Sequence, residues 1–282
     1  MTAGLVLLEG RAAGAARERH APVFVVGSPR SGTTFLGQSL ASLPGFVDGG
    51  ELPDFKPMLP DLIGRSPRTI AGALRHAVRD ALGGDMQRGR LVVHAPELSF
   101  VAHVLKRVEP GTLVVHIVRD GRDVASSLVR DGWLSAATSE LDVNGWALGS
   151  APRFWTEQSR RREFSEVSDA RRAAWAWRRY VSAALDLAAP GRDSVLVRYE
   201  SLCSDSAFFG EALAATAGCD PAGLSHALSG AHAGSVGRYE RELTSSDLAD
   251  VEAEAGALLT RLGYLGGAAA EPRSGTRLPE PW

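Results

Sequence analysis

The sequence predicts an α/β protein built as a three-layer sandwich, with a central parallel sheet covered by helices on both faces. Short runs of β-forming apolar residues alternate with longer amphipathic stretches along most of the chain. A glycine-rich, P-loop-like turn follows the first apolar run and precedes the first amphipathic stretch. The 282 residues suffice for one large domain of this class and are too few for two of full size.

Each element is justified by its apolar period and by the residues that flank it. We expect strands over residues 23–27, 91–93, 113–118 and 194–199, and helices over residues 33–43, 69–82, 98–107, 119–130, 170–189, 207–217 and 246–262. We expect an N-terminal extension over residues 1–20, one domain over 21–265 and a flexible C-terminal tail over 266–282. Within the domain, Trp133, Trp146, Phe154 and Trp155 follow no clear period, so we expect residues 131–170 to form an irregular lid or acceptor-binding insertion.

Composition excludes several classes of protein. The formal net charge of -2 gives no reason to expect a nucleic-acid partner, so any basic site must be local. Cys203 and Cys219 are too few for a disulfide framework, and no cluster of His, Cys, Asp and Glu has the spacing of a metal site. The apolar run Leu5 to Leu8 is shorter than a signal-peptide core, and no stretch approaches a membrane span. We therefore expect a cytoplasmic protein without stable membrane insertion and without a metal.

The loop Gly27-Ser28-Pro29-Arg30-Ser31-Gly32-Thr33-Thr34 is the clearest chemical feature of the sequence. A glycine-rich turn between a strand and a helix brings backbone N–H groups and the positive end of the helix dipole to one point, which suits a phosphate or sulfate. Gly27 and Gly32 have the separation of the P-loop pattern G-x-x-x-x-G-K-[ST], but Thr33 occupies the lysine position. Arg30 can supply the missing charge through its planar guanidinium.

At these residues the chain resembles the sulfotransferases. Residues 29–34 are similar to their 5′-phosphosulfate loop, in the arginine form of tyrosylprotein sulfotransferases and many bacterial relatives. Arg119 at a strand end and Ser127 eight residues later match the family's 3′-phosphate site, and eight residues is a little over two helical turns, so both groups can reach one anion. Tyr199, in Tyr199-Glu200-Ser201-Leu202, resembles a tyrosine near the nucleotide. Ser235 and Arg238 resemble the late loop that closes over the 3′-phosphate.

The resemblance implies an enzyme that transfers a sulfonate group from 3′-phosphoadenosine 5′-phosphosulfate (PAPS) to an acceptor hydroxyl or amine and releases 3′,5′-diphosphoadenosine (PAP). The residues it implies for the nucleotide are Arg30, Ser31, Gly32, Thr33, Thr34, Arg119, Ser127, Tyr199, Ser235 and Arg238. Arg30 is expected to stabilise the leaving 5′-phosphate. Glu51, after Gly49-Gly50, matches a catalytic glutamate, and His94, in His94-Ala95-Pro96, matches a position held by a catalytic histidine or lysine. We favour Glu51 as the base and His94 as a proton or charge partner, although histidine can fill either role.

Two other readings stay open. A P-loop kinase of a small metabolite shares the strand, loop and helix, but the missing lysine and the lack of an acidic strand end for magnesium disfavour it. A catalytically inactive nucleotide-binding protein could keep the fold. For the acceptor we expect a small metabolite, glycolipid or natural product in bacterial secondary metabolism, and a homodimer is left open.

Overall fold

The computed structural model describes residues 21–83, 89–135, 140–141, 146–148, 152–155, 158–185 and 194–266. The expected N-terminal extension over residues 1–20 and the expected tail beyond residue 266 lie outside the described residues, as does part of the expected insertion.

Five strands form a central sheet in which every neighbouring pair is parallel. Their order is β2 (Phe46–Asp48), β3 (Arg90–Val93), β1 (Val23–Val26), β4 (Leu113–Val118) and β8 (Ser194–Arg198). Every residue of β1, β3 and β4 is buried, as expected for parallel strands that are covered on both faces. The predicted fold class is confirmed.

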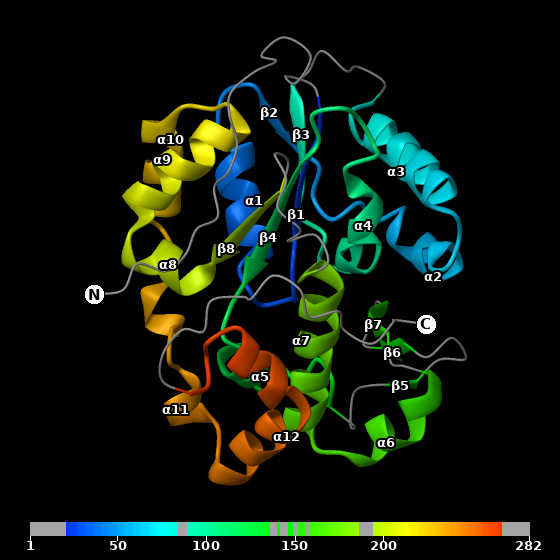
Figure 1. Cartoon of the computed structure of the whole chain (residues 1–282), viewed down its shortest axis with the longest axis vertical. Helices are drawn as coiled ribbons and strands as arrows, with labels where there is room; N and C mark the ends of the chain where they lie inside the picture. Colours follow the sequence, from blue (N-terminus) through cyan, green and yellow to red (C-terminus); the bar gives the residue numbers. More distant parts are fainter. Residues whose placement is uncertain are drawn as a thin grey trace.

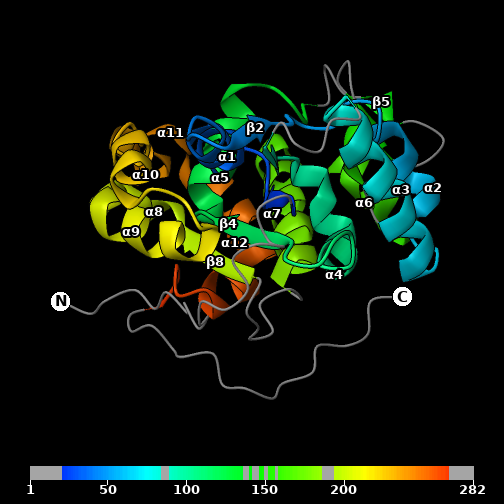
Figure 2. The same cartoon turned by 90° about the horizontal axis from the view of Figure 1, so that it is seen from above.

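Helices cover the two faces of the sheet (Figure 1). Val23 and Val25 face the core formed with α1 (Thr33–Ala41), α9 (Ser206–Ala217) and α10 (Pro221–Leu228). Phe24 and Val26 point the other way, to the core formed with α3 (Pro67–Ala81), the 3-10 helix η3 (Pro96–Val101) and α4 (Ala102–Leu105). The view from above shows α8 to α10 on one flank of the sheet and α2 to α4 on the other (Figure 2). Alternate β1 residues therefore anchor opposite layers.

A third group of helices packs around two buried tryptophans, Trp175 and Trp177. It contains α5 (Gly121–Arg130), α7 (Asp169–Leu185) and α12 (Ser245–Arg261). The remaining elements are η2 (Lys56–Met58), α2 (Leu59–Leu62), β5 (Glu140–Leu141), β6 (Trp146–Leu148), β7 (Pro152–Trp155), η4 (Gln158–Arg160), α6 (Arg161–Glu166), α8 (Tyr199–Ser204), η6 (Ala233–Ser235) and α11 (Tyr239–Glu242). None of the described helices combines the length and apolar composition that a bilayer crossing requires.

The structure corrects several predicted boundaries. The helix expected over residues 98–107 is a 3-10 segment followed by the short α4, and the Ser99 hydroxyl there accepts a 3.1 Å hydrogen bond from the Gly27 N–H. The helix expected from residue 119 begins at Gly121, because the Asp120 side chain caps it by accepting from the Arg122 N–H. The segment expected to be irregular contains a three-stranded antiparallel sheet of β5, β6 and β7. Strands of two to four residues are too short to show a period.

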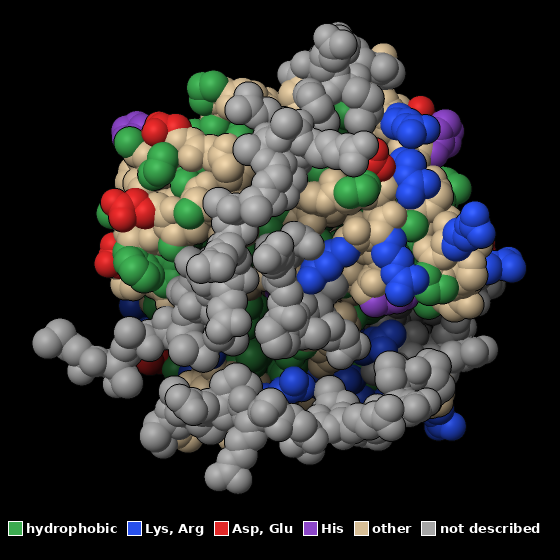
Figure 3. Space-filling view, turned by 45° about the horizontal axis from the view of Figure 1, so that its top comes forward, with side chains coloured by type: hydrophobic (Ala, Val, Ile, Leu, Met, Phe, Trp, Pro, Cys, Tyr) green, Lys and Arg blue, Asp and Glu red, His purple; other side chains and the backbone are tan. Residues whose placement is uncertain are grey.

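The sheet order places a topological switch point beside β1. The chain moves from β1 to β2 and β3 on one side, and then to β4 and β8 on the other. Ligands of open α/β sheets bind outside the carboxyl ends of the strands at such a point. On the face drawn in Figure 3, acidic side chains lie mainly on the α8 to α10 flank and basic side chains on the α2 to α4 flank. The sheet topology therefore points to the loop between β1 and α1.

Candidate active site

The loop between β1 and α1 is held in a strained turn. Arg30 has φ 68 and Gly32 has φ 94, both in the left-handed region. A Cβ at Gly32 would lie 2.7 Å from the Tyr199 ring, so a glycine is required there for space as well as for conformation. Gly32 also caps α1, whose first N–H groups have no partner within the helix. The buried Ser31 hydroxyl has no hydrogen-bond partner in the described part of the chain. The loop is thus a cradle of donors for an anion.

Arg30 connects this loop to α5. Its Nε donates a 2.9 Å hydrogen bond to the Ser127 Oγ, and its Nη2 lies 2.9 Å from the Asp131 carboxylate. The guanidinium also lies 5.4 Å from the centre of the Trp133 ring. The loop and α5, which the sequence analysis assigned to the two phosphates of one nucleotide, therefore meet at Arg30 and Ser127.

Arg119 lies at the end of β4, almost fully buried. Its Nη1 donates to the Arg30 backbone carbonyl at 3.2 Å, and its Nη2 donates to the Ser235 carbonyl. The guanidinium stacks 4.9 Å from the Tyr199 ring centre, and Nε finds no hydrogen-bond partner among the described residues. Its Nη2 also lies 3.7 Å from the Asp123 carboxylate. The Nε N–H is therefore the group of this guanidinium that can donate to a charged oxygen of a ligand.

The segment around Ser235 is fixed to α5 by a carboxylate. Asp123 accepts from the N–H groups of Gly237 at 2.9 Å and Tyr239 at 3.0 Å. The Ser235 hydroxyl lies 3.3 Å from the Tyr199 phenol oxygen, and burial raises the pKa of Tyr199. This tyrosine stays protonated at neutral pH and can donate a hydrogen bond.

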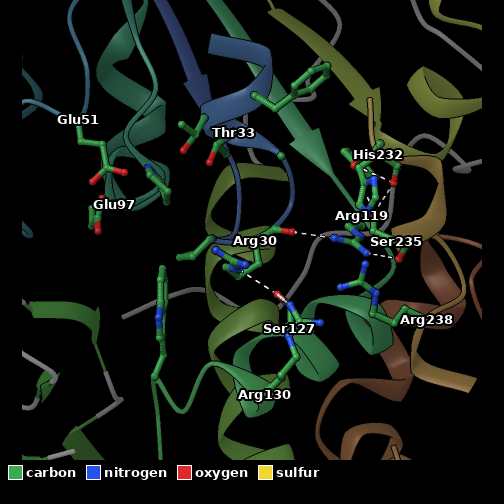
Figure 4. Close-up of a pocket in the computed structure, with 17 residues that line it drawn as sticks. Arg30, Thr33, Glu51, Glu97, Arg119, Ser127, Arg130, His232, Ser235 and Arg238 are labelled. Carbon is green, nitrogen blue, oxygen red and sulfur yellow. Dashed lines mark hydrogen bonds between the residues drawn. The ribbon is translucent and has the colours of Figure 1, made fainter. Parts of the chain in front are cut away.

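A pocket of about 280 Å³ opens between these segments (Figure 4). The predicted site residues that line it are Arg30, Gly32, Thr33, Thr34, Glu51, Arg119, Ser127, Tyr199, Ser235 and Arg238. Ser31 and His94 do not line it. Pro29 of the loop and Pro96 of the His94-Ala95-Pro96 motif line it too, as do four residues that the sequence did not place at the site, Phe35, Glu97, Arg130 and His232. Trp133, noted in the sequence for the acceptor or the core, lines the pocket as well.

Charges are separated along this pocket. Arg119 and Arg238 lie at one end in Figure 4, Glu51 and Glu97 lie at the other, and Arg30 lies between them. The arrangement can bind an anionic donor at the arginine end and leave carboxylates beside the group that it transfers.

The carboxylate end contains a lysine as well. The Lys56 ammonium contacts Glu51 and lies 3.2 Å from the Glu97 carboxylate. Burial raises the pKa of Glu97, and the Lys56 ammonium opposes this rise. In the sequence the only signal for Glu97 was its position directly after His94-Ala95-Pro96, and nothing marked Lys56.

His94 is buried behind this end of the pocket, at the end of β3. Its Nε2 lies 3.2 Å from Asp48 Oδ1, and its backbone N–H donates to the Gly50 carbonyl at 2.9 Å. Asp48 Oδ1 also accepts from the Gly50 N–H at 2.8 Å. His94 and Asp48 together therefore fix the turn that carries Glu51.

The described residues contain no group of three His, Cys, Asp or Glu side chains arranged to hold a metal ion. The donors that converge on the pocket are guanidinium, hydroxyl and backbone N–H groups, which bind phosphate and sulfate oxygens directly.

Comparison with known proteins identifies the fold and finds a family model that matches part of the chain. A model described as "Sulfotransferase family" matches residues 22–83, which include the loop and Glu51. The sulfotransferase domain of the Synechococcus PCC 7002 olefin synthase is 17% identical with a TM-score of 0.53, and the match covers 89% of this chain and 98% of that one. The sulfotransferase domain from the curacin biosynthetic pathway is 14% identical with a TM-score of 0.55, covering 84% and 97%. No curated protein matches the sequence. Residues 22–83 are thus similar to the sulfotransferase family, and the chain shares the fold of two sulfotransferase domains.

Proposed function

We propose that the pocket binds PAPS with its 5′-phosphosulfate on the loop of residues 27–34 and its 3′-phosphate between Arg119 and Ser127. The observation that carries this proposal is the convergence of the two anion sites on one pocket, joined by the Arg30 to Ser127 hydrogen bond. A donor with phosphates at both ends of one nucleoside needs two such sites at a fixed separation. Ser235 and Arg238 close the 3′-phosphate end, and Tyr199 lies under the nucleotide between the two sites.

The transfer is an in-line displacement at sulfur. The acceptor oxygen or nitrogen forms a bond to sulfur while the bond from sulfur to the 5′-phosphate oxygen breaks, and PAP leaves with that electron pair. The acceptor's proton passes to the Glu51 carboxylate. Arg30 and the N–H groups of Ser31 to Thr34 stabilise the charge that gathers on the leaving phosphate.

His94 supports the reaction through the Glu51 turn. Its contacts to Asp48 and Gly50 lie on the backbone that presents Glu51, and its side chain does not line the pocket. We therefore assign His94 the role of a positioning residue for the base, in place of the direct partnership with the sulfonate that the sequence favoured.

The acceptor is proposed to be a small molecule, a natural product or a glycolipid with a free hydroxyl or amine. Two neighbours with the same fold are domains of an olefin synthase and of the curacin biosynthetic pathway, which fits a natural-product acceptor. Phe35, Pro96 and Trp133 give the pocket apolar contacts that such an acceptor can use. We further propose a cytoplasmic enzyme, with residues 21–265 as its catalytic domain.

Incubation of the purified protein with sulfur-35 PAPS and fractionated metabolite and lipid extracts tests this function. We expect label to pass to an acceptor without added magnesium, and mass spectrometry of the product to show one added sulfonate. A protein that transfers phosphate from magnesium–ATP instead would be a kinase. A protein that binds PAP and transfers no label to any fraction would be an inactive nucleotide-binding relative.

A further inference from the structure

The carboxylate end of the pocket is a cluster of three charged groups from three elements. Glu51 follows β2, Lys56 begins η2 and Glu97 belongs to η3. The Lys56 ammonium contacts both carboxylates, and its nitrogen lies 3.2 Å from the Glu97 carboxylate oxygen. The exposed fraction of the side chains falls from 41% for Glu51 to 20% for Lys56 and 4% for Glu97. The cluster therefore runs from the open pocket into the protein interior.

Burial makes the inner carboxylate the fixed point of the cluster. Glu97 belongs to η3, between the buried Pro96 and Leu98, and its own side chain is buried where it lines the pocket. A lysine side chain has four rotatable bonds and a strongly hydrated ammonium, and at an exposed site it gains little from a single ion pair. Pairing with a buried carboxylate holds the Lys56 ammonium in place beside Glu51.

We propose that Lys56 and Glu97 are positioning residues for Glu51: Lys56 holds the Glu51 carboxylate at the pocket, and Glu97 anchors Lys56 there. The inference rests on the proposed function, in which Glu51 accepts the acceptor's proton. It adds a lysine from η2 and a glutamate from η3 that neither the family match nor the sequence motifs assign.

The arrangement also couples the charge of Glu97 to Lys56. Burial raises the pKa of Glu97, and the Lys56 ammonium opposes this rise. The ion pair therefore favours the charged form of Glu97, which is the form that anchors Lys56. Two further titratable groups lie at the ends of β2 and β3, before Glu51 and Glu97 in the chain. They are Asp48 and His94, and they bond to each other.

Lysine acylation tests the anchor, because Lys56 and Lys106 are the only lysines of the chain. A limiting amount of acetic anhydride is added, and the two sites are quantified by peptide mass spectrometry. We expect Glu97→Gln to raise the acetylation rate of Lys56 several-fold relative to Lys106, whose ammonium bonds to Ser194. Glu109→Gln, which removes an exposed partner of Arg75, is the matched control and leaves the ratio unchanged. An unchanged ratio in Glu97→Gln would overturn the anchoring role.

Carbon-13 NMR of protein labelled at the glutamate carboxyl carbons tests the hold on Glu51, with the signal identified from its loss in Glu51→Gln. In Lys56→Met we expect the Glu51 signal at neutral pH to move and broaden, because the ammonium that contacts this carboxylate is removed and the side chain is no longer held in one position. Lys56→Arg should restore the signal, and Lys106→Met should leave it unchanged. A Glu51 signal that is unchanged in Lys56→Met contradicts the proposal.

Activity separates this inference from the function on which it rests. With an acceptor found by the sulfur-35 assay, Lys56→Met should lose about tenfold in kcat on the acid side of the profile and recover to within about twofold at high pH. Its PAP affinity should stay that of the wild type. A defect of equal size at every pH would mean that the cluster only maintains the fold. If Glu51→Gln itself kept full turnover, the proposed function would fail, while the NMR and acylation results would still report on the cluster.

Discussion

The Nε of Arg30 donates a 2.9 Å hydrogen bond to the hydroxyl of Ser127. This bond joins the loop after β1 to the helix after β4, the two segments that end side by side at the carboxyl edge of the sheet. Arg119 strengthens the junction by donating to the Arg30 carbonyl. The proposed sites for the two ends of the nucleotide are therefore parts of one structure, and substitutions in either should affect the same ligand.

Arg30→Ala should lower kcat by about 100-fold or more, because the guanidinium is proposed to stabilise charge that develops only as the phosphate leaves. The affinity for PAP, measured by calorimetry, should fall much less. Arg162→Ala removes an arginine whose side chain is 91% exposed and should leave kcat unchanged. A raised KM for the donor with unchanged kcat would show that Arg30 binds donor and transition state equally.

Ser127→Ala should weaken PAP binding by about tenfold, the loss expected for a hydrogen bond to a charged group. Adenosine 5′-phosphate lacks the 3′-phosphate, so its affinity should not change. Ser204→Ala, at an exposed hydroxyl that donates to the Ser201 carbonyl, serves as the control. Equal losses for the two nucleotides would place the 3′-phosphate elsewhere.

Glu51→Gln and His94→Ala should each lower kcat strongly while PAP affinity stays nearly intact. The first change removes the proposed base, and the second removes the side chain that bonds to Asp48 beneath the Glu51 turn. Steady-state kinetics and calorimetry on both variants check this, with His76→Gln, at an 80% exposed histidine, as the control. Near-normal turnover in either variant would remove that residue from the mechanism.

Gly32→Ala should destabilise the protein by about 2 kcal/mol or more and abolish PAP binding. Its Cβ would lie 2.7 Å from the Tyr199 ring, at a backbone φ of 94 that alanine rarely adopts. In the matched change Gly256→Ala the new Cβ meets nothing closer than 4.0 Å in the helix α12, so stability should rise by up to about 1 kcal/mol. Urea unfolding of both variants measures the difference. A stable Gly32→Ala variant that binds PAP would contradict the tight packing of the loop.

His116 should make folding sensitive to acid. Burial lowers the pKa of this histidine from 6.5 to about 3, and neither ring nitrogen has a hydrogen-bond partner among the described residues. Between these pH values the unfolded chain binds a proton at His116 and the folded protein does not. The free energy of unfolding therefore falls as the pH drops through this range, by about 1 kcal/mol per unit from this group. His116→Leu should reduce the slope of unfolding free energy against pH, whereas an unchanged slope would mean that His116 is protonated in the folded state.

Local patterns placed the residues of the proposed donor end on the elements where the structure has them. The loop from Gly27 to Thr34 and the pair Arg119 and Ser127 each lie within one strand, turn and helix, so their spacing in the sequence fixes their geometry. The structure brings these residues together around the pocket, with Ser31 just outside its lining.

The residues of the acceptor end could not be predicted from local sequence patterns. Lys56 of η2 and Glu97 of η3 come together only in the folded chain, and no local pattern encodes their contact. The strand β2 escaped prediction because three residues between two glycine-containing turns show no period. The burial of His94 behind the pocket likewise depends on its packing against Gly37 of α1, where a Cβ would lie 2.4 Å from the histidine Cβ.

Calorimetric titration of the protein with PAP in the absence of magnesium tests the central claim most directly. We predict micromolar or tighter binding without magnesium, a loss of about tenfold in Ser127→Ala, and no comparable binding of ATP with or without magnesium. Tight binding of magnesium–ATP together with no measurable binding of PAP would contradict the account.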